Sequence, residues 1–458
     1  MSFCIQTSAP VQACGRVFGP AMHALVRLGV LASIGATLLS SAPAAGASLT
    51  SDAPLTLAGS QRLAVARSRQ IAAQDAGIAA SREQAVAAGQ LPDPVLKIGI
   101  DNLPVTTSDR FSLTRDFMTM RRVGVMQELT GADKRRFRTD RLDREADKTL
   151  AEKVVTQAAI ERDTAIAWLD RYYSEAVAAA IAEQGAQAKL EIQAAEGAYR
   201  AGRGSQADVF AARSAVAMFD DRASEAARRV RNARTMLSRW VGEAASGALS
   251  GVPAIDHIRL DPRLLDAQLA HHPEVAVMQR QEDLARADVR LAEASRNADW
   301  SVEVAYQQRG AAYSDMISVG VTIPLQWDRK QRQDREVSAK LALVDKASAE
   351  REESLRMHVA ETRTMIEEWQ NNLDRIARYE RELVPLANDR TLAALTAYRG
   401  GKAPLTDVLS ARRNTIDVRI QALQLQAEAA RLWARLNFLT PADGVPSELP
   451  MSMPGEKK

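Results

Sequence analysis

The sequence predicts a mainly α-helical protein with a small amount of β-structure, built from two copies of one unit. Three observations lead to this prediction. One motif occurs twice, at residues 198–213 and 397–412. Segments with strand-like alternation precede long stretches that are almost free of glycine and proline. A glycine-rich break at residues 241–262 separates the two halves. Such internal repetition indicates that one supersecondary unit has been duplicated.

The N-terminus, residues 1–47, is predicted to be a signal peptide. A weakly basic start precedes an apolar segment at residues 28–39, and Ala45-Gly46-Ala47 fits an A-x-A cleavage site. This apolar segment is too short for a lasting membrane span. An uncleaved N-terminal anchor is the alternative. Cys4 and Cys14 both precede the cleavage point, so the mature chain would have no disulfide, thiolate metal site or cysteine nucleophile.

Two pairs of β-strands are expected, at about 94–129 and 299–325. Apolar side chains alternate with polar ones, most clearly at residues 299–307 and 316–325, and a period of two is typical of strands with one buried face. Turn-rich segments lie between the members of each pair. Strands of this length suit a membrane β-barrel, although a small soluble sheet packed on helices has the same pattern.

Four long helices are predicted, at about 133–199, 206–240, 328–398 and 404–438. At 1.5 Å per residue, the longest would extend over roughly 100 Å. Pro385 should kink or loosen the third of these helices. The domain organisation that follows is a first repeat at 48–250, a second repeat at 251–440, and a C-terminal tail at 441–458.

The duplicated motif joins the helices of each half. Residues 198–213 read AYRAGRGSQADVFAAR and residues 397–412 read AYRGGKAPLTDVLSAR. Both fit A-Y-R-x-G-[RK]-x4-D-V-x2-A-R. A glycine at the end of a long helix allows the left-handed conformation in which the chain reverses.

The sequence resembles the TolC family of outer-membrane efflux ducts over about residues 55–440, through these two motifs, Pro324-Leu325 after the last strand and the hairpin–helix order. The segment LPDPVLKIGIDNLP at 91–104 most resembles outer-membrane components of cobalt-zinc-cadmium heavy-metal resistance systems. The resemblance implies a TolC-like fold: a homotrimer with a 12-stranded β-barrel in outer-membrane lipid and a periplasmic α-helical barrel. It also implies docking to a periplasmic adaptor (membrane fusion) protein and an inner-membrane pump of the RND type. Four strands cannot close a barrel alone, so the membrane interpretation requires several chains.

The resemblance assigns roles to specific residues of the two turns. The adaptor docking tips would be formed by Tyr199, Arg200, Gly202, Tyr398, Arg399 and Gly401. Helix capping is the simpler explanation of the glycines. The periplasmic aperture would be lined by Asp407 and Asp208, whose carboxylates would favour cations. Ser410 occupies the position of a second acidic ring. Stabilisation of a helix N-terminus is the alternative for both aspartates.

The function expected is a passive exit duct that exports heavy-metal cations, located in the outer membrane with helices in the periplasm. A periplasmic coiled-coil adaptor or scaffold is the alternative. No catalytic residues and no cofactor are expected, because the sequence has no phosphate loop or nucleophile motif. The net charge of +3 gives no reason to expect a nucleic-acid partner. No metal site is expected either: the adjacent His271 and His272 point in different directions on a helix, and Met118, Met120 and Met126 suit packing.

Overall fold

A computed structural model of the chain describes residues 54–202 and 204–442. The chain divides into two units, Met1–Ser51 and Asp52–Lys458, and every described residue belongs to the second unit. The predicted signal peptide at 1–47, with Cys4 and Cys14, lies outside the described residues, as does most of the predicted tail at 441–458. Within the described part, no helix combines the length and the apolar character needed to cross a membrane.

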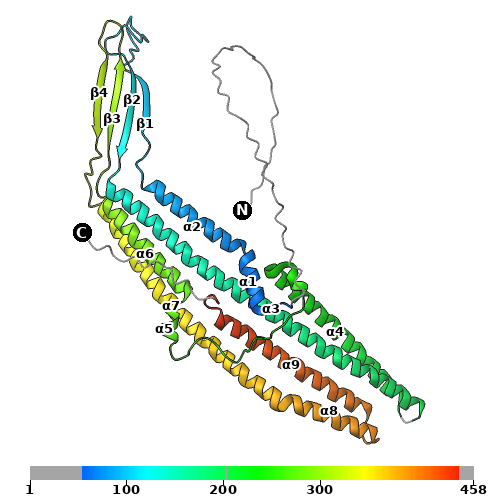
Figure 1. Cartoon of the computed structure of the whole chain (residues 1–458). Helices are drawn as coiled ribbons and strands as arrows, with labels where there is room; N and C mark the ends of the chain where they lie inside the picture. The colour runs from blue at the N-terminus through cyan, green and yellow to red at the C-terminus, as the bar shows by residue number, and fades with distance from the viewer. Residues whose placement is uncertain (1–53, 203, 443–458) are drawn as a thin grey trace, which may run out of the picture. The chain divides into compact units, whose positions relative to one another are not determined.

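Each half has the same order of elements, in which helices precede a β-hairpin and two long helical stretches follow it, the first of which is divided into α7 and α8 in the second half (Figure 1). The first half contains α1 (Leu57–Arg67), α2 (Arg69–Ala88), β1 (Val95–Asp101), β2 (Met120–Leu129), α3 (Ala132–Arg200) and α4 (Gln206–Val241). A 3-10 turn, Gly242–Ser246, begins the connection to the second half. The second half contains α5 (Leu265–Leu269), α6 (Pro273–Ala294), β3 (Trp300–Gln308), β4 (Met316–Thr322), α7 (Gln333–Arg378), α8 (Val384–Arg399) and α9 (Leu405–Asn437).

The helices before each hairpin, α1, α2, α5 and α6, were not among the predicted elements. The helix expected at about 328–398 is also interrupted. It begins at Gln333 and contains a π-helical turn at Tyr379–Leu383, between α7 and α8. Pro385 is the second residue after this turn. Because proline has no N–H to donate and its ring clashes with the preceding turn, the local change of hydrogen bonding occurs beside it.

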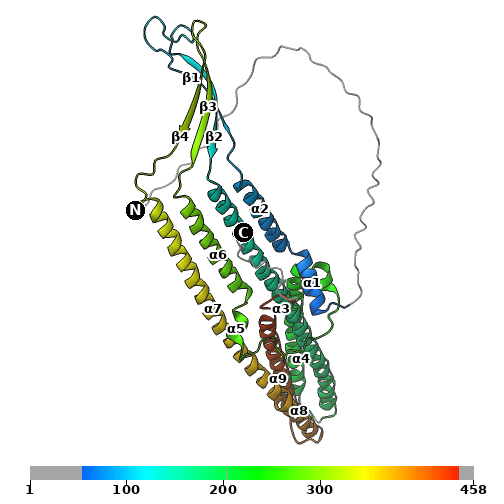
Figure 2. The ribbon, with the colours of Figure 1, turned by 60° about the vertical axis from the view of Figure 1, so that its left-hand side comes forward.

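The four strands form one antiparallel sheet in the order β1-β2-β3-β4, so β1 and β4 are its edges. The register places Ile98 opposite Val123, Val123 opposite Tyr306, and Tyr306 opposite Ile317. The two hairpins, far apart in the sequence, therefore join through the pairing of β2 with β3. The sheet lies at one end of the helices, and the α3–α4 and α8–α9 turns lie at the opposite end (Figure 2).

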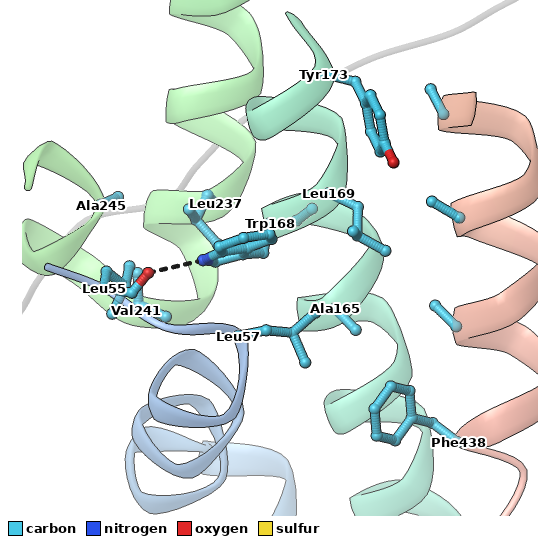
Figure 3. Packing of buried hydrophobic residues seen from close by; sticks show 14 residues of the cluster. Leu55, Leu57, Ala165, Trp168, Leu169, Tyr173, Leu237, Val241, Ala245 and Phe438 are labelled. Carbon is cyan, nitrogen blue, oxygen red and sulfur yellow. Dashed lines mark hydrogen bonds between the residues drawn. The ribbon is translucent and has the colours of Figure 1, made fainter. Parts of the chain in front are cut away.

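The main core lies where α1, α3, α4 and α9 meet. Trp168 is completely buried in α3, and its indole N–H donates a hydrogen bond of 3.0 Å to the carbonyl of Leu55 (Figure 3). Leu169 and Leu237 are also completely buried in this cluster. An indole of this size contributes most when its N–H also finds a partner. Trp168 thus fixes the extended segment before α1 against the long helix.

The second half repeats this arrangement. The indole N–H of Trp369 in α7 donates a hydrogen bond of 3.0 Å to the carbonyl of Ile255, in the extended segment before α5. Trp369 is buried and packs with Leu265, Leu269 and Leu436. The two tryptophans occupy equivalent places in the two halves of the repeat, so the duplication extends to the core.

Candidate functional site

The turn between α3 and α4 reverses the chain at Gly202, whose φ is +67°. The Gly202 N–H donates to the carbonyl of Tyr199 at 3.0 Å, and the Gly204 N–H donates to the carbonyl of Ala198 at 3.1 Å. Only glycine adopts this left-handed conformation without strain from a Cβ atom. The glycine of the first motif is therefore required by the backbone.

The turn between α8 and α9 also reverses the chain at a left-handed glycine. Gly401 has φ +71° and donates to the carbonyl of Tyr398 at 2.9 Å. The Lys402 N–H donates to the carbonyl of Ala397 at 2.8 Å. These two bonds together form a Schellman motif, which satisfies carbonyls at the end of a helix. The shared motif thus produces the same chain reversal twice.

The two turns belong to one packed end of the molecule. The buried residues of this cluster are Ala195 of α3, Val209 and Ala212 of α4, and Leu405 and Val408 of α9. Both valines directly follow the motif aspartates. The D-V pair of each motif therefore supplies one apolar anchor to a common core, which holds the two tips together.

The tips differ in the exposure of their tyrosines. Tyr199 is 50% exposed, whereas Tyr398 is partly buried and packs against the shared cluster. Arg200 and Arg399 are both exposed. Arg200 contacts its own helix, with Nε donating at 3.3 Å to the carbonyl of Glu196. Among the described residues, the tips therefore expose the Tyr199 ring and the guanidinium groups of Arg200 and Arg399.

Asp208 is engaged in capping α4. Its carboxylate accepts hydrogen bonds from the backbone N–H of Ser205 at 2.9 Å and from the Ser205 hydroxyl at 2.7 Å. The Asp208 N–H in turn donates to the Ser205 hydroxyl oxygen at 3.1 Å, which completes a capping box. The hydrogen bonds from Ser205 lower the pKa of Asp208. These contacts favour the capping interpretation of Asp208.

Asp407 lies in a different environment, although it occupies the same position of the motif. Pro404 replaces the capping serine, and α9 has no side-chain cap. Asp407 is exposed, and its contact with the turn is the hydrogen bond of 3.2 Å from its N–H to the Pro404 carbonyl. Within residues 54–202 and 204–442, no ion pair involves its carboxylate. The carboxylate therefore remains available to ions in solution.

The final arginine of each motif contacts a glutamate of α3. Arg213 forms an ion pair of 2.9 Å with Glu196, and the arginine is 60% exposed. Arg412 pairs with Glu191, and here both side chains are nearly buried. Burial raises the pKa of Glu191, although the charge and hydrogen bond of Arg412 act to lower it. The second motif thus places an ion pair between the two halves.

Further ion pairs continue along the same helix contact. Arg419 of α9 pairs with Glu183 of α3 at 2.9 Å, and Arg431 pairs with Asp170 at 2.6 Å. All of these arginines lie on α9 and all of their partners lie on α3. This row of ion pairs joins α9 of the second half to α3 of the first half over most of the length of α9.

The sheet has one apolar face and one polar face. The apolar face carries side chains from all four strands that are about half exposed or more: Leu96, Ile98, Ile100, Val123, Val125, Trp300, Val304, Tyr306, Ile317, Val319 and Val321. Lys97 and Glu303 on the opposite face pair at 2.6 Å, and Arg122 lies 3.4 Å from Asp101. An apolar patch of this extent on a single chain marks a surface covered by a partner or by lipid.

A cluster that sequence reasoning did not predict lies where the start of α6 meets α7. His272 caps α6 and is buried, and it lies beside His358 of α7 with ring centroids 4.7 Å apart. Burial, His358 and Arg162 lower the pKa of His272 to about 4. The neighbouring His271 is exposed and contacts only its own helix turn through Ala267. Histidine is scarce in this chain, with five in total, and that scarcity was the available signal.

The methionines considered as soft ligands do not gather. Met118 lies in the connection before β2, and Met120 and Met126 lie within β2, on the same face of the strand but six positions apart. This arrangement gives no support to a common metal site.

Known proteins share this fold. Residues 264–441 match the sequence model of the family described as Outer membrane efflux protein. The structure of the outer-membrane channel OprN is similar, with a TM-score of 0.70 and 17% identity over 84% of this chain and 90% of that chain. VceC, an outer membrane protein from Vibrio cholerae, has a TM-score of 0.67 and 19% identity over 84% of this chain and 95% of that chain. CusC, whose structures describe transmembrane channel formation, has a TM-score of 0.67 and 13% identity over 83% and 92%. A comparison with curated protein sequences found no match. The chain therefore has the fold of outer-membrane efflux channels, and its second half matches that family's sequence model.

Proposed function

We propose that this chain is the passive outer-membrane exit duct of a tripartite efflux system. The observation that carries the proposal is the apolar face of the sheet, which is exposed in the single chain and crosses all four strands in two adjacent rows, Leu96-Val125-Val304-Val319 and Ile98-Val123-Tyr306-Ile317. Strands of 9 and 10 residues, such as β3 and β2, tilted by about 40°, cover roughly 24 Å of height, close to the apolar band of outer-membrane barrels. Lipid is the environment that such a face fits.

The open edges of the sheet argue for an oligomer. β1 and β4 each have one unpaired side, and unpaired backbone groups cannot remain in hydrocarbon. Pairing of β4 with β1 of a second copy satisfies both edges. Three copies give a closed barrel of twelve strands, above the practical minimum of about eight strands. The polar face, with Lys97, Arg122 and Glu303, would then line the interior.

The end of the molecule with the two turns is proposed to dock a periplasmic adaptor, which would connect the duct to an inner-membrane pump of the RND type. The shared core of the turns holds Tyr199, Arg200 and Arg399 on the surface. Gly202 and Gly401 set the shape of the tips, and Tyr398 supports the core beneath them. Aromatic and arginine side chains of this kind are frequent anchors of protein interfaces.

Asp407 is proposed to line the periplasmic aperture. In a homotrimer its exposed carboxylate occurs three times around the axis, which would concentrate negative potential and favour cations. Asp208 is a weaker candidate, because its carboxylate is already bound to Ser205. Heavy-metal cations are the proposed cargo. The resemblance of residues 91–104 to metal-resistance components supports this choice, together with the cation preference expected from Asp407.

Membrane fractionation combined with crosslinking and heat-modifiable gel mobility tests the proposal. We expect the mature chain in the outer membrane as a trimer whose mobility changes after boiling. Recovery of a monomer from the soluble periplasm would refute the duct and favour the adaptor or scaffold alternative. A deletion strain should become sensitive to divalent heavy metals. Sensitivity to organic drugs alone would refute the metal cargo while leaving the duct intact.

A further inference from the structure

The start of α6 and the middle of α7 border a cavity of about 530 Å³, which α3 and the end of α9 complete. Three possible metal ligands meet at its wall: His272, Glu274 and His358. We propose that these side chains bind one divalent transition-metal cation. This site is distinct from the proposed duct, and nothing in the duct proposal requires it.

The distances suit a metal ion with small adjustments. The possible ligand atoms of the three residues all lie within 4.8 Å of one another, and His358 Nε2 lies 2.9 Å from Glu274 Oε2. Ligands about 2.1 Å from a tetrahedral zinc ion are about 3.4 Å apart. Glu274 is exposed and free to turn, so side-chain rotation alone can bring the set to that spacing.

The hydrogen bonding of the histidines leaves capacity for a ligand. His358 Nε2 is buried, and its close approach to the Glu274 carboxylate does not have the direction of a hydrogen bond. A buried polar atom without a partner costs about 1–3 kcal/mol. His272 Nδ1 accepts one long hydrogen bond, 3.3 Å, from the Glu274 N–H. A metal ion would satisfy the unpaired nitrogen at the cost of that one weak bond.

The donor set selects the class of cation. Two imidazoles and one carboxylate are the ligands of many Zn²⁺ sites, and they also suit Co²⁺ and Ni²⁺. A carboxylate among the ligands disfavours Cu(I), which prefers sulfur. The fourth position would face the cavity and admit water or Glu361, which lines the same wall. No cysteine is needed for such a site.

The charge around the cavity does not oppose a cation. Arg162 and Arg435 line it, but so do the carboxylates of Asp163, Glu274 and Glu361. The Arg162 guanidinium is paired with Asp163 at 3.0 Å, which offsets its repulsion. The bound ion would connect the first turn of α6 to α7.

Titration of the purified mature protein in detergent with Co²⁺ tests this proposal, because tetrahedral cobalt bound to nitrogen and oxygen ligands absorbs visible light. We expect one ion per chain and a rise in Tm when Zn²⁺ is added. His358→Asn should weaken Co²⁺ binding on the order of 100-fold or more, since even changes outside the ligand set cost 10–100-fold. His271→Asn is the matched control, because this exposed neighbour should leave binding unchanged.

Glu274→Gln keeps the test decisive if His358→Asn does not fold, because Glu274 is exposed. It should also weaken binding, while the circular dichroism spectrum stays unchanged. The proposal is overturned if the unmodified chain binds neither Co²⁺ nor Zn²⁺ at micromolar concentration. It is equally overturned if Glu274→Gln binds Co²⁺ as tightly as the unmodified chain and the control His271→Asn do. Neither result would affect the duct, whose trimer and membrane location are measured separately.

Discussion

Replacement of Arg412 by alanine tests the ion pair that joins the two halves. Arg412 and Glu191 are nearly buried between α9 and α3, and Glu191 Oε2 already has no hydrogen-bond partner. Removing the arginine leaves an uncompensated carboxylate, and breaking a buried pair in this way costs about 3–5 kcal/mol. We therefore expect Arg412→Ala to lower the free energy of unfolding by about 3 kcal/mol or more.

The duplicated motif provides the matched control. Arg213 occupies the same motif position in the first half, but it is 60% exposed and pairs with the half-buried Glu196. Exposed pairs contribute about 0.2–1 kcal/mol. Arg213→Ala should therefore cost several-fold less than Arg412→Ala. Thermal unfolding followed by circular dichroism compares the two variants. Equal losses of stability would refute the reasoning, because they would show that burial does not distinguish the pairs.

The pH dependence of this loss gives a second check. Burial raises the pKa of Glu191 above its ordinary value of 4.5, and Arg412 acts against that rise. When a carboxyl has a higher pKa in the folded than in the unfolded state, the free energy of unfolding falls as the pH rises through the folded-state pKa. Without Arg412 the pKa of Glu191 rises further. The deficit of Arg412→Ala should be largest at neutral pH and shrink as acid protonates Glu191. A deficit that grows in acid would contradict this account.

Three further predictions concern the turns. Asp407→Ala should raise single-channel conductance or reduce cation preference in planar bilayers, and unchanged conductance and selectivity would remove Asp407 from the aperture. Asp208→Ala should leave conductance and selectivity unchanged and instead cost about 1 kcal/mol of stability through the lost cap. Arg399→Glu should abolish resistance while the trimer still forms on gels, and normal resistance would count against docking at the tips. Gly401→Ala should speed amide hydrogen exchange in the second turn, because an alanine in the left-handed conformation adds about 1 kcal/mol of strain. Gly400→Ala should not change the exchange rate, because Gly400 has φ −80°. Equal exchange rates in both variants would contradict the strain expected at Gly401.

Local patterns predicted the repeated parts of the fold. The alternation at 299–307 and 316–325 corresponds to β3 at Trp300–Gln308 and β4 at Met316–Thr322, because strand side chains change face at each residue. The scarcity of glycine and proline in 133–199 corresponds to α3. In α2, by contrast, alanines surround the helix and give no clear apolar stripe, so its sequence offered no period to detect.

The environments of the candidate residues depend on contacts between residues far apart in the chain, which a short stretch of sequence does not show. His272 and His358 are far apart in the sequence, and only the packing of α6 against α7 brings them together. The capping of α4 was easier to predict from the sequence, because Ser205 and Asp208 have the spacing of a capping box. Pro404 at the equivalent place of the second motif removes that cap. One substitution thus separates the roles expected for the two motif aspartates.

The most direct test of the account asks which face of the sheet meets lipid. Single cysteines introduced along β4 from Ile317 to Val321 and spin-labelled would report accessibility to oxygen, which enters lipid, and to a water-soluble nickel complex. The native cysteines, Cys4 and Cys14, lie in the predicted signal peptide and would not interfere. The account predicts that labels at Ile317, Val319 and Val321 are accessible mainly to oxygen, while labels at Ser318 and Gly320 are accessible mainly to the nickel complex. Equal access of the nickel complex to all five positions would contradict a membrane-spanning sheet and with it the proposed duct.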